Sequence, residues 1–76
     1  MKRIRLLNFA RIADLRGVSE EWIESGADTP KQLCQELGLP FGITDLRVAV
    51  NHEFASADSP LVDGDVVAFL PPFAGG

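Results

Sequence analysis

The sequence contains few of the side chains that disulfides and metal sites require. Cys34 is its one cysteine and His52 its one histidine. A single cysteine excludes a disulfide within the chain, and one cysteine with one histidine makes no recognisable metal site. We therefore expect a chain that binds no cofactor and no metal, and that works in the reducing cytoplasm.

Long apolar runs and an excess of basic residues are also absent. No apolar run approaches the ~20 residues of a membrane span, and the opening stretch MKRIRLLNFA lacks the apolar core of a signal peptide. The net charge of −4 argues against binding to nucleic acid and suits a basic groove on a protein partner. We expect protein partners, no nucleic acid and no membrane.

What is present is sufficient for one small domain. Hydrophobic residues make up 46% of the 76 residues, too many for a disordered polypeptide. No repeat or linker divides the sequence, and so short a chain leaves little room for an internal substrate pocket. We expect a folded domain over residues 1–70 and a flexible tail over residues 71–76.

Hydrophobic periodicity predicts strands and helices in alternation. The apolar residues Phe54, Leu61 and Val62 are expected to face the core. In chain order the expected elements are a strand at 2–7, a helix at 9–16, a strand at 18–25, a helix at 30–37, a strand at 46–50, a short strand around Phe54 and a final strand at 65–70.

The helix at 30–37 has the clearest start and stop signals. Thr29 stands at the N-cap, Pro30 at the first helical position and Gln32 where a capping box places its second polar residue, while Gly38 follows the last turn. Cys34 lies on this helix without a neighbouring base, so we interpret it as a small core residue and not as a nucleophile.

The sequence shows no motif that would give the histidine a catalytic partner. Asn51 and His52 favour a turn, and no serine or cysteine motif or second histidine stands with them. We expect a solvent-facing turn residue.

The final strand, DVVAFL, is apolar on both faces, which is typical of a strand with neighbours on both sides. The element order predicts an α+β roll in which a helix packs across one face of a mixed sheet.

The last eight residues, FLPPFAGG, form the most distinctive stretch. Pro71 and Pro72 fix φ and remove two backbone donors, so the final strand cannot continue through them. Gly75 and Gly76 lack a Cβ, which lets the backbone lie extended in a channel too narrow for side chains. From Pro71 the extended tail reaches about 20 Å, enough to bring a terminal carboxylate into another protein's active site. A disordered, inert end is the alternative.

The stretch PLVDGDVVAFLPPFAGG at residues 60–76 closely resembles the C-terminal signature of MoaD-type sulfur carriers, the small subunits of molybdopterin synthase within the ubiquitin-like β-grasp superfamily. FARIADLRG at 9–17, the capped helix and AVN at 49–51 follow in that family's order. Val66 stands where the family often has an acidic residue, Leu70 where it often has an aromatic one, and the segment before residue 46 is short. Carriers for thiamine or cysteine biosynthesis share the Gly-Gly end, and the proline pair favours the molybdopterin branch.

The resemblance implies a role for each tail residue. An ATP-dependent, ubiquitin-activating-like adenylyltransferase would adenylate the carboxylate of Gly76, which sulfur then converts to a thiocarboxylate. The large synthase subunit, in a heterotetramer of two small and two large subunits, would receive this sulfur and build the dithiolene. The chain itself would be a carrier and co-substrate, not an enzyme. The inserted segment would consist of Pro71, Pro72, Phe73, Ala74 and Gly75.

Three residues are candidates for an apolar docking patch at the root of the tail: Leu61, Phe69 and Phe73. Phe69 belongs to a central strand, where a core position is more common, so Phe73 is the stronger candidate. Three functions remain open from the sequence. The chain is a sulfur carrier for molybdopterin, a sulfur carrier for another pathway or a ubiquitin-like protein modifier, or a non-catalytic β-grasp interaction domain with an inert tail.

Overall fold

The computed structural model describes residues 1–40, 42 and 45–71. The elements follow the predicted order of strand, helix, strand, helix and three strands. They are β1 (Lys2–Asn8), α1 (Ala10–Arg16), β2 (Glu20–Ser25), α2 (Pro30–Leu37), β3 (Arg47–Val50), β4 (Glu53–Ala55) and β5 (Val66–Leu70). Within the described residues, no helix has the length and apolar character needed to cross a membrane.

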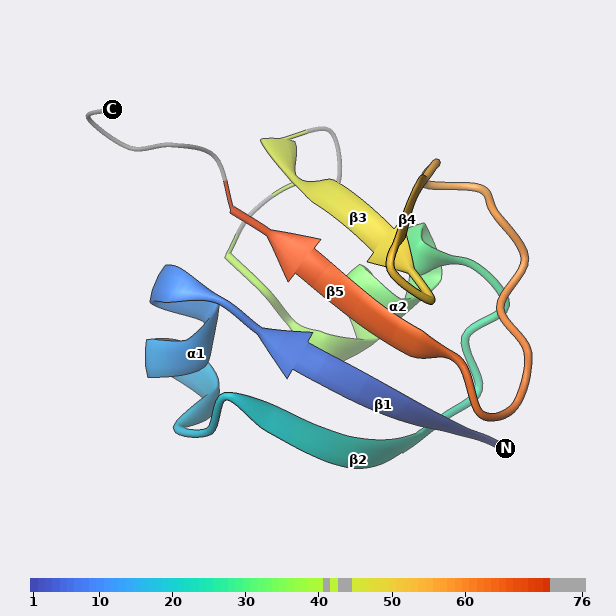
Figure 1. Cartoon of the computed structure of the whole chain (residues 1–76), viewed down its shortest axis with the longest axis horizontal. Coiled ribbons are helices and arrows are strands. Elements are labelled where there is room, and N and C mark those ends of the chain that lie inside the picture. The colour runs from blue at the N-terminus through green and yellow to red at the C-terminus, as the bar shows by residue number, and fades with distance from the viewer. Residues whose placement is uncertain (41, 43–44, 72–76) are drawn as a thin grey trace.

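The strands form one mixed sheet in the order β2-β1-β5-β3-β4 (Figure 1). β1 and β5 run parallel, whereas the other neighbouring pairs run antiparallel. The last strand therefore lies at the centre of the sheet, and α2 lies across one face (Figure 1). This confirms the predicted β-grasp roll. A central β5 is held by hydrogen bonds from both sides, so the chain leaving it starts from a fixed position.

The core fills the space between α2 and the inner face of the sheet. Side chains alternate between the two faces along each strand, so every second residue of β1 and β5 points toward α2. The buried apolar cluster consists of Ile4, Leu6, Ile12, Ala27, Leu33, Cys34, Leu46, Val48, Leu61, Val67 and Phe69. Cys34 thus has the predicted core position, and burial raises the pKa of its thiol.

The start of α2 differs from the predicted capping box in one bond. Thr29 Oγ1 accepts a hydrogen bond from the backbone N–H of Gln32 at 3.2 Å, as expected. The Gln32 side chain, however, accepts from the backbone N–H of Asp28 at 2.8 Å and not from that of Thr29. The helix ends at Gly38, whose φ of 66° is the left-handed value that glycine adopts without strain.

Two residues predicted to face the core are exposed. Phe54 is 71% exposed because it pairs with Ala49, and that position points to the face of the sheet away from α2. Val62 is 59% exposed and lies outside the strands, just before the turn at 63–64, where its N–H donates to Asp65 Oδ2 at 2.9 Å. The pattern of apolar residues alone does not distinguish these two faces.

Candidate functional site

The root of the tail is the end of β5. Leu70 pairs with Arg47 of β3, and on the other side of β5 the last paired residues are Phe69 and Asn8 of β1. Pro71 follows directly and offers no N–H to continue either ladder. The remaining predicted site residues, Pro72, Phe73, Ala74, Gly75 and Gly76, lie outside the described residues.

Two of the three predicted docking residues are buried. Leu61 is 3% exposed and Phe69 is 0% exposed. Phe69 alternates onto the inner face of β5, and both side chains belong to the buried cluster under α2. The prediction that they form a surface patch is therefore wrong for this structure, and of the three only Phe73, outside the described residues, remains a docking candidate.

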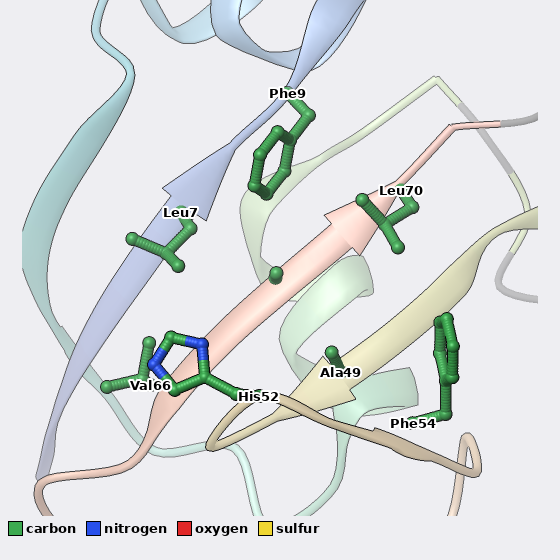
Figure 2. A pocket seen from close by; sticks show the side chains of 8 residues that line it. Leu7, Phe9, Ala49, His52, Phe54, Val66 and Leu70 are labelled. Atoms are coloured by element: carbon green, nitrogen blue, oxygen red, sulfur yellow. The ribbon is translucent and has the colours of Figure 1, made fainter.

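The face of the sheet away from α2, called here the open face, carries an apolar row across four strands. The strand register aligns Leu7 of β1 with Ala68 of β5, Ala68 with Ala49 of β3, and Ala49 with Phe54 of β4. Two alanines in the middle and larger side chains on either side leave a shallow depression of about 180 Å³. Figure 2 shows the side chains that line it, which are those of Leu7, Phe9, Ala49, His52, Phe54, Val66, Ala68 and Leu70.

The two ends of this depression differ. Phe9 and Leu70 stand at the end where β5 leads to the tail, and His52 and Val66 stand at the opposite end (Figure 2). His52 is the turn residue that the sequence predicts, but it also contributes its ring to this apolar surface. Docking on the depression would therefore set a partner next to the root of the tail.

Residues with a positive φ, which is unfavourable for any residue with a Cβ, lie at or next to both ends of the depression. His52 has a φ of 70° and Asn51 one of 54°, in the two-residue turn between β3 and β4. Ala10, next to Phe9, has a φ of 50°. Left-handed values of this kind cost residues with a Cβ about 1 kcal/mol and concentrate at functional sites. The positions that carry the Phe9 and His52 rings are thus held at some cost in stability.

Side chains of the AVN motif at 49–51 and of the DGD segment at 63–65 fix the start of β5. Asn51 Nδ2 donates to Asp65 Oδ1 at 3.0 Å, and Asn51 Oδ1 accepts from the backbone N–H of Val66 at 3.0 Å. Asp63 Oδ1 accepts from the backbone N–H of Arg3 at 2.7 Å, and this bond ties the turn before β5 to β1. These motif residues therefore act on the fold, since they hold the strand that carries the tail.

The strands β1 and β2 and the helix α1 are joined by a polar network. Arg16 Nη2 lies 2.7 Å from Glu21 Oε1, and Asn8 Nδ2 donates to Glu21 Oε2 at 2.9 Å. The hydrogen bond from Arg16 holds the pKa of the Glu21 carboxyl below its ordinary value, against the opposing effect of burial. This network attaches α1 to the sheet near the base of Phe9.

The described residues bring together no group of three or more histidine, cysteine or acidic side chains in an arrangement that could hold a metal ion.

Residues 6–76 match the ThiS family. The chain belongs to this family. A molybdopterin synthase sulfur carrier subunit of Escherichia coli (strain K12) is 35% identical over 80 residues, covering 96% of this chain and 99% of its own. The resemblance drawn from residues 60–76 is thereby confirmed.

Two solved structures extend the comparison. The complex of subunits 1 and 2 of the molybdopterin-converting factor from Helicobacter pylori contains a chain that matches with a TM-score of 0.62 and 28% identity, covering 97% of this chain and 99% of that one. Small archaeal modifier protein 1 of Haloferax volcanii matches with a TM-score of 0.76 and 21% identity, covering 95% of this chain and 99% of its own. The second likeness shows that the fold is shared, and nothing more.

Sequence reasoning missed the open face of this ThiS-family chain. The sequence pattern places Leu7 in a strand, His52 in a turn and Phe54 in the core, and it relates none of them to the others. The signal was the apolar character of both faces of residues 66–70, together with the small residues Ala49 and Ala68. What was lacking was the strand register that aligns these positions.

Proposed function

We propose that the chain is the sulfur carrier subunit of a molybdopterin synthase and that it carries sulfur as a thiocarboxylate on Gly76. The observation that carries this proposal is the match, over nearly the full length of both chains, to a relative of that name. The chemistry of the tail supports it, because a main-chain carboxylate after two glycines can enter a narrow active site.

Activation requires a partner, because a carboxylate is a poor electrophile. In the proposed step, the carboxylate of Gly76 attacks the α-phosphorus of ATP on an adenylyltransferase, and pyrophosphate leaves. A sulfur nucleophile then displaces AMP from the acyl-adenylate and leaves sulfur on the terminal carbonyl carbon. The chain itself binds no cofactor in this scheme, and the ATP belongs to the activating enzyme.

The large synthase subunit is the proposed acceptor of the sulfur. It would supply the acid–base and cationic groups, while this chain presents the thiocarboxylate at the end of Pro71, Pro72, Phe73, Ala74 and Gly75. The carrier is consumed in each transfer and loaded again, so it acts as a co-substrate in the cytoplasm. An assembly of two small and two large subunits would let each carrier serve one active site.

The fold supports delivery in two ways. β5 is fixed on both sides by β1 and β3, so the tail begins from a defined point and direction. The open-face depression lies beside that point, with Phe9 and Leu70 at its near end. A partner seated on the open face would lie next to the start of the tail, whose extended length is about 20 Å.

Membership of the ThiS family does not separate molybdopterin carriers from carriers for other pathways, and for this reason the test must follow the sulfur. The experiment is intact mass spectrometry of the chain after incubation with the adenylyltransferase, ATP and a sulfur source, followed by addition of large subunit and pterin precursor. We expect the mass change of one oxygen replaced by sulfur, lost again as molybdopterin forms.

The other outcomes are equally informative. Loading of sulfur without formation of molybdopterin would assign the carrier to another pathway. Isopeptide-linked conjugates on cellular proteins would identify a modifier. Absence of loading with an enzyme that loads a known carrier would reject the proposal and favour a non-catalytic interaction domain.

A further inference from the structure

The edges of the open face carry arginines stacked on aromatic rings. Arg47 of β3 lies with its guanidinium carbon 5.5 Å from the centre of the Phe54 ring on β4. Arg3 of β1 lies with its guanidinium carbon 4.6 Å from the centre of the Trp22 ring on β2. β4 and β2 are the two edge strands of the sheet. The apolar depression thus lies between two arginine–aromatic pairs.

Within the part of the chain that the structure describes, no carboxylate forms an ion pair with either guanidinium. Among the described residues, the ion pairs within 4.0 Å involve other basic groups: Lys2 with Asp28, Arg5 with Glu20, and Arg16 with Glu21. Glu24 stands opposite Arg3 in the strand register, yet the Arg3 side chain lies over Trp22 instead. Over residues 1–40, 42 and 45–71, both arginines are thus exposed cations without a carboxylate within ion-pair distance.

Arg47 is the more informative of the two because of its surroundings. It pairs with Leu70, the last residue of β5, and so stands at the root of the tail. The open-face positions of β3, β4 and β5 are otherwise apolar, namely Ala49, Phe54, Val66, Ala68 and Leu70. A chain with a net charge of −4 thus places a positive charge beside the end of β5.

A stacked guanidinium is suited to reading a carboxylate. The cation–π attraction to the ring restricts the side chain, and the planar guanidinium can still donate two N–H groups to one carboxylate. Fixing the side chain in advance also lowers the entropy lost when the partner binds. A lysine at the same position would keep the charge without this planar geometry.

We propose that the open face binds a protein surface with an apolar centre flanked by carboxylates, and that Arg47 on Phe54 and Arg3 on Trp22 read those carboxylates. This inference rests on the proposed function, in which the occupant is the large synthase subunit. It reverses, for this face, the expectation of a basic partner groove that follows from the net charge. Arg47 is the specificity-determining contact nearest to the tail.

The test measures affinity between the full chain and the large subunit of the same organism's synthase by isothermal titration calorimetry, at low and high salt. We expect Arg47→Glu to weaken binding by about tenfold or more, because it sets like charges against each other. Arg3→Glu should act in the same direction, and Arg47→Lys should lie between Arg47→Glu and the unchanged chain. High salt should weaken the unchanged chain and reduce the difference between variants.

Lys31→Glu is the matched control. Lys31 is exposed on α2, across the sheet from the open face, and its replacement changes the net charge by the same amount. Its affinity should stay within about twofold of the unchanged chain. All three substituted side chains lie on the surface, so the variants should fold. Their melting temperatures check this.

Two results would overturn the inference while leaving the proposed function standing: equal effects of Arg47→Glu and Lys31→Glu, or tighter binding by Arg47→Glu. Failure of the unchanged, folded chain to bind the large subunit would remove the partner and with it both proposals.

Discussion

Asn51 and Asp65 are joined by a hydrogen bond from Nδ2 to Oδ1 of 3.0 Å, which ties the turn between β3 and β4 to the residue before β5. Asp65 also accepts from the backbone N–H of Val62 through its other oxygen. One carboxylate thus fixes two loops around the start of the strand that leads to the tail. The bond thus helps to fix where β5 begins.

Replacement of Asp65 should lower stability. Asp65 is 7% exposed, and Asp65→Ala leaves Asn51 Nδ2 and the N–H of Val62 without their acceptor. We expect the free energy of unfolding in urea to fall by about 1–3 kcal/mol. Asp58→Ala, at an exposed position, serves as the control and should change it little. Equal losses in the two variants would show that the network contributes nothing specific.

Replacement of His52 by glycine should raise stability and weaken docking. The φ of 70° at His52 suits glycine in a two-residue hairpin turn, so His52→Gly should raise the free energy of unfolding by about 1 kcal/mol. The same change removes a ring from the end of the depression. Thermal melts and affinity for the large subunit, measured together, check the two effects. A more stable variant with unchanged affinity would assign His52 no part in docking.

Truncation of Phe69 should lower stability, whereas truncation of Phe54 should lower affinity for the large subunit. Phe69 is 0% exposed, so Phe69→Ala should cost about 3–5 kcal/mol of stability. Phe54→Ala removes a side chain that is 71% exposed and should change stability by less than about 0.5 kcal/mol. It should nevertheless weaken binding of the large subunit, because the depression loses one wall and Arg47 loses its platform. Urea titrations and calorimetry separate these effects.

Acid should weaken the fold partly through Glu21. The pKa of Glu21 is lowered in the folded chain, chiefly by its hydrogen bond with Arg16. Its contribution is therefore fully present above the unfolded pKa, about 4.3, and is lost as the pH falls through the lower folded value. Glu21→Gln should be less stable than the unchanged chain at neutral pH, and the difference should shrink in acid. A difference that is constant from neutral to acid pH would contradict this.

The terminal carboxylate should be indispensable and its distance fixed. Deletion of Gly76, or addition of one residue after it, should abolish sulfur loading and leave the melting temperature unchanged, because the reaction needs a main-chain carboxylate at one reach. Intact mass spectrometry after incubation with the adenylyltransferase measures loading. Full loading of either variant would remove Gly76 from the proposed mechanism.

The sequence predicted the parts of the structure that depend on local signals. The helix from Pro30 to Leu37 followed from its cap and its C-terminal glycine, and the roll followed from the order of elements. Which of Phe54 and Phe69 is buried depends on the pairing of distant strands, and no local pattern specifies that register. The arginine–aromatic pairs could not be predicted for the same reason. Arg3 contacts Trp22 only because β1 pairs with β2 in this register.

The parallel pairing of Arg5 with Val66 has a consequence for synthesis of the chain. A ribosome releases β1 first, yet β1 and β3 gain their common neighbour only when β5 has emerged. The centre of the sheet therefore closes late, through contacts of long sequence separation that form slowly. A nascent chain that stops before residue 66 therefore lacks the central strand of the sheet, and β1 and β3 have no common neighbour to pair with.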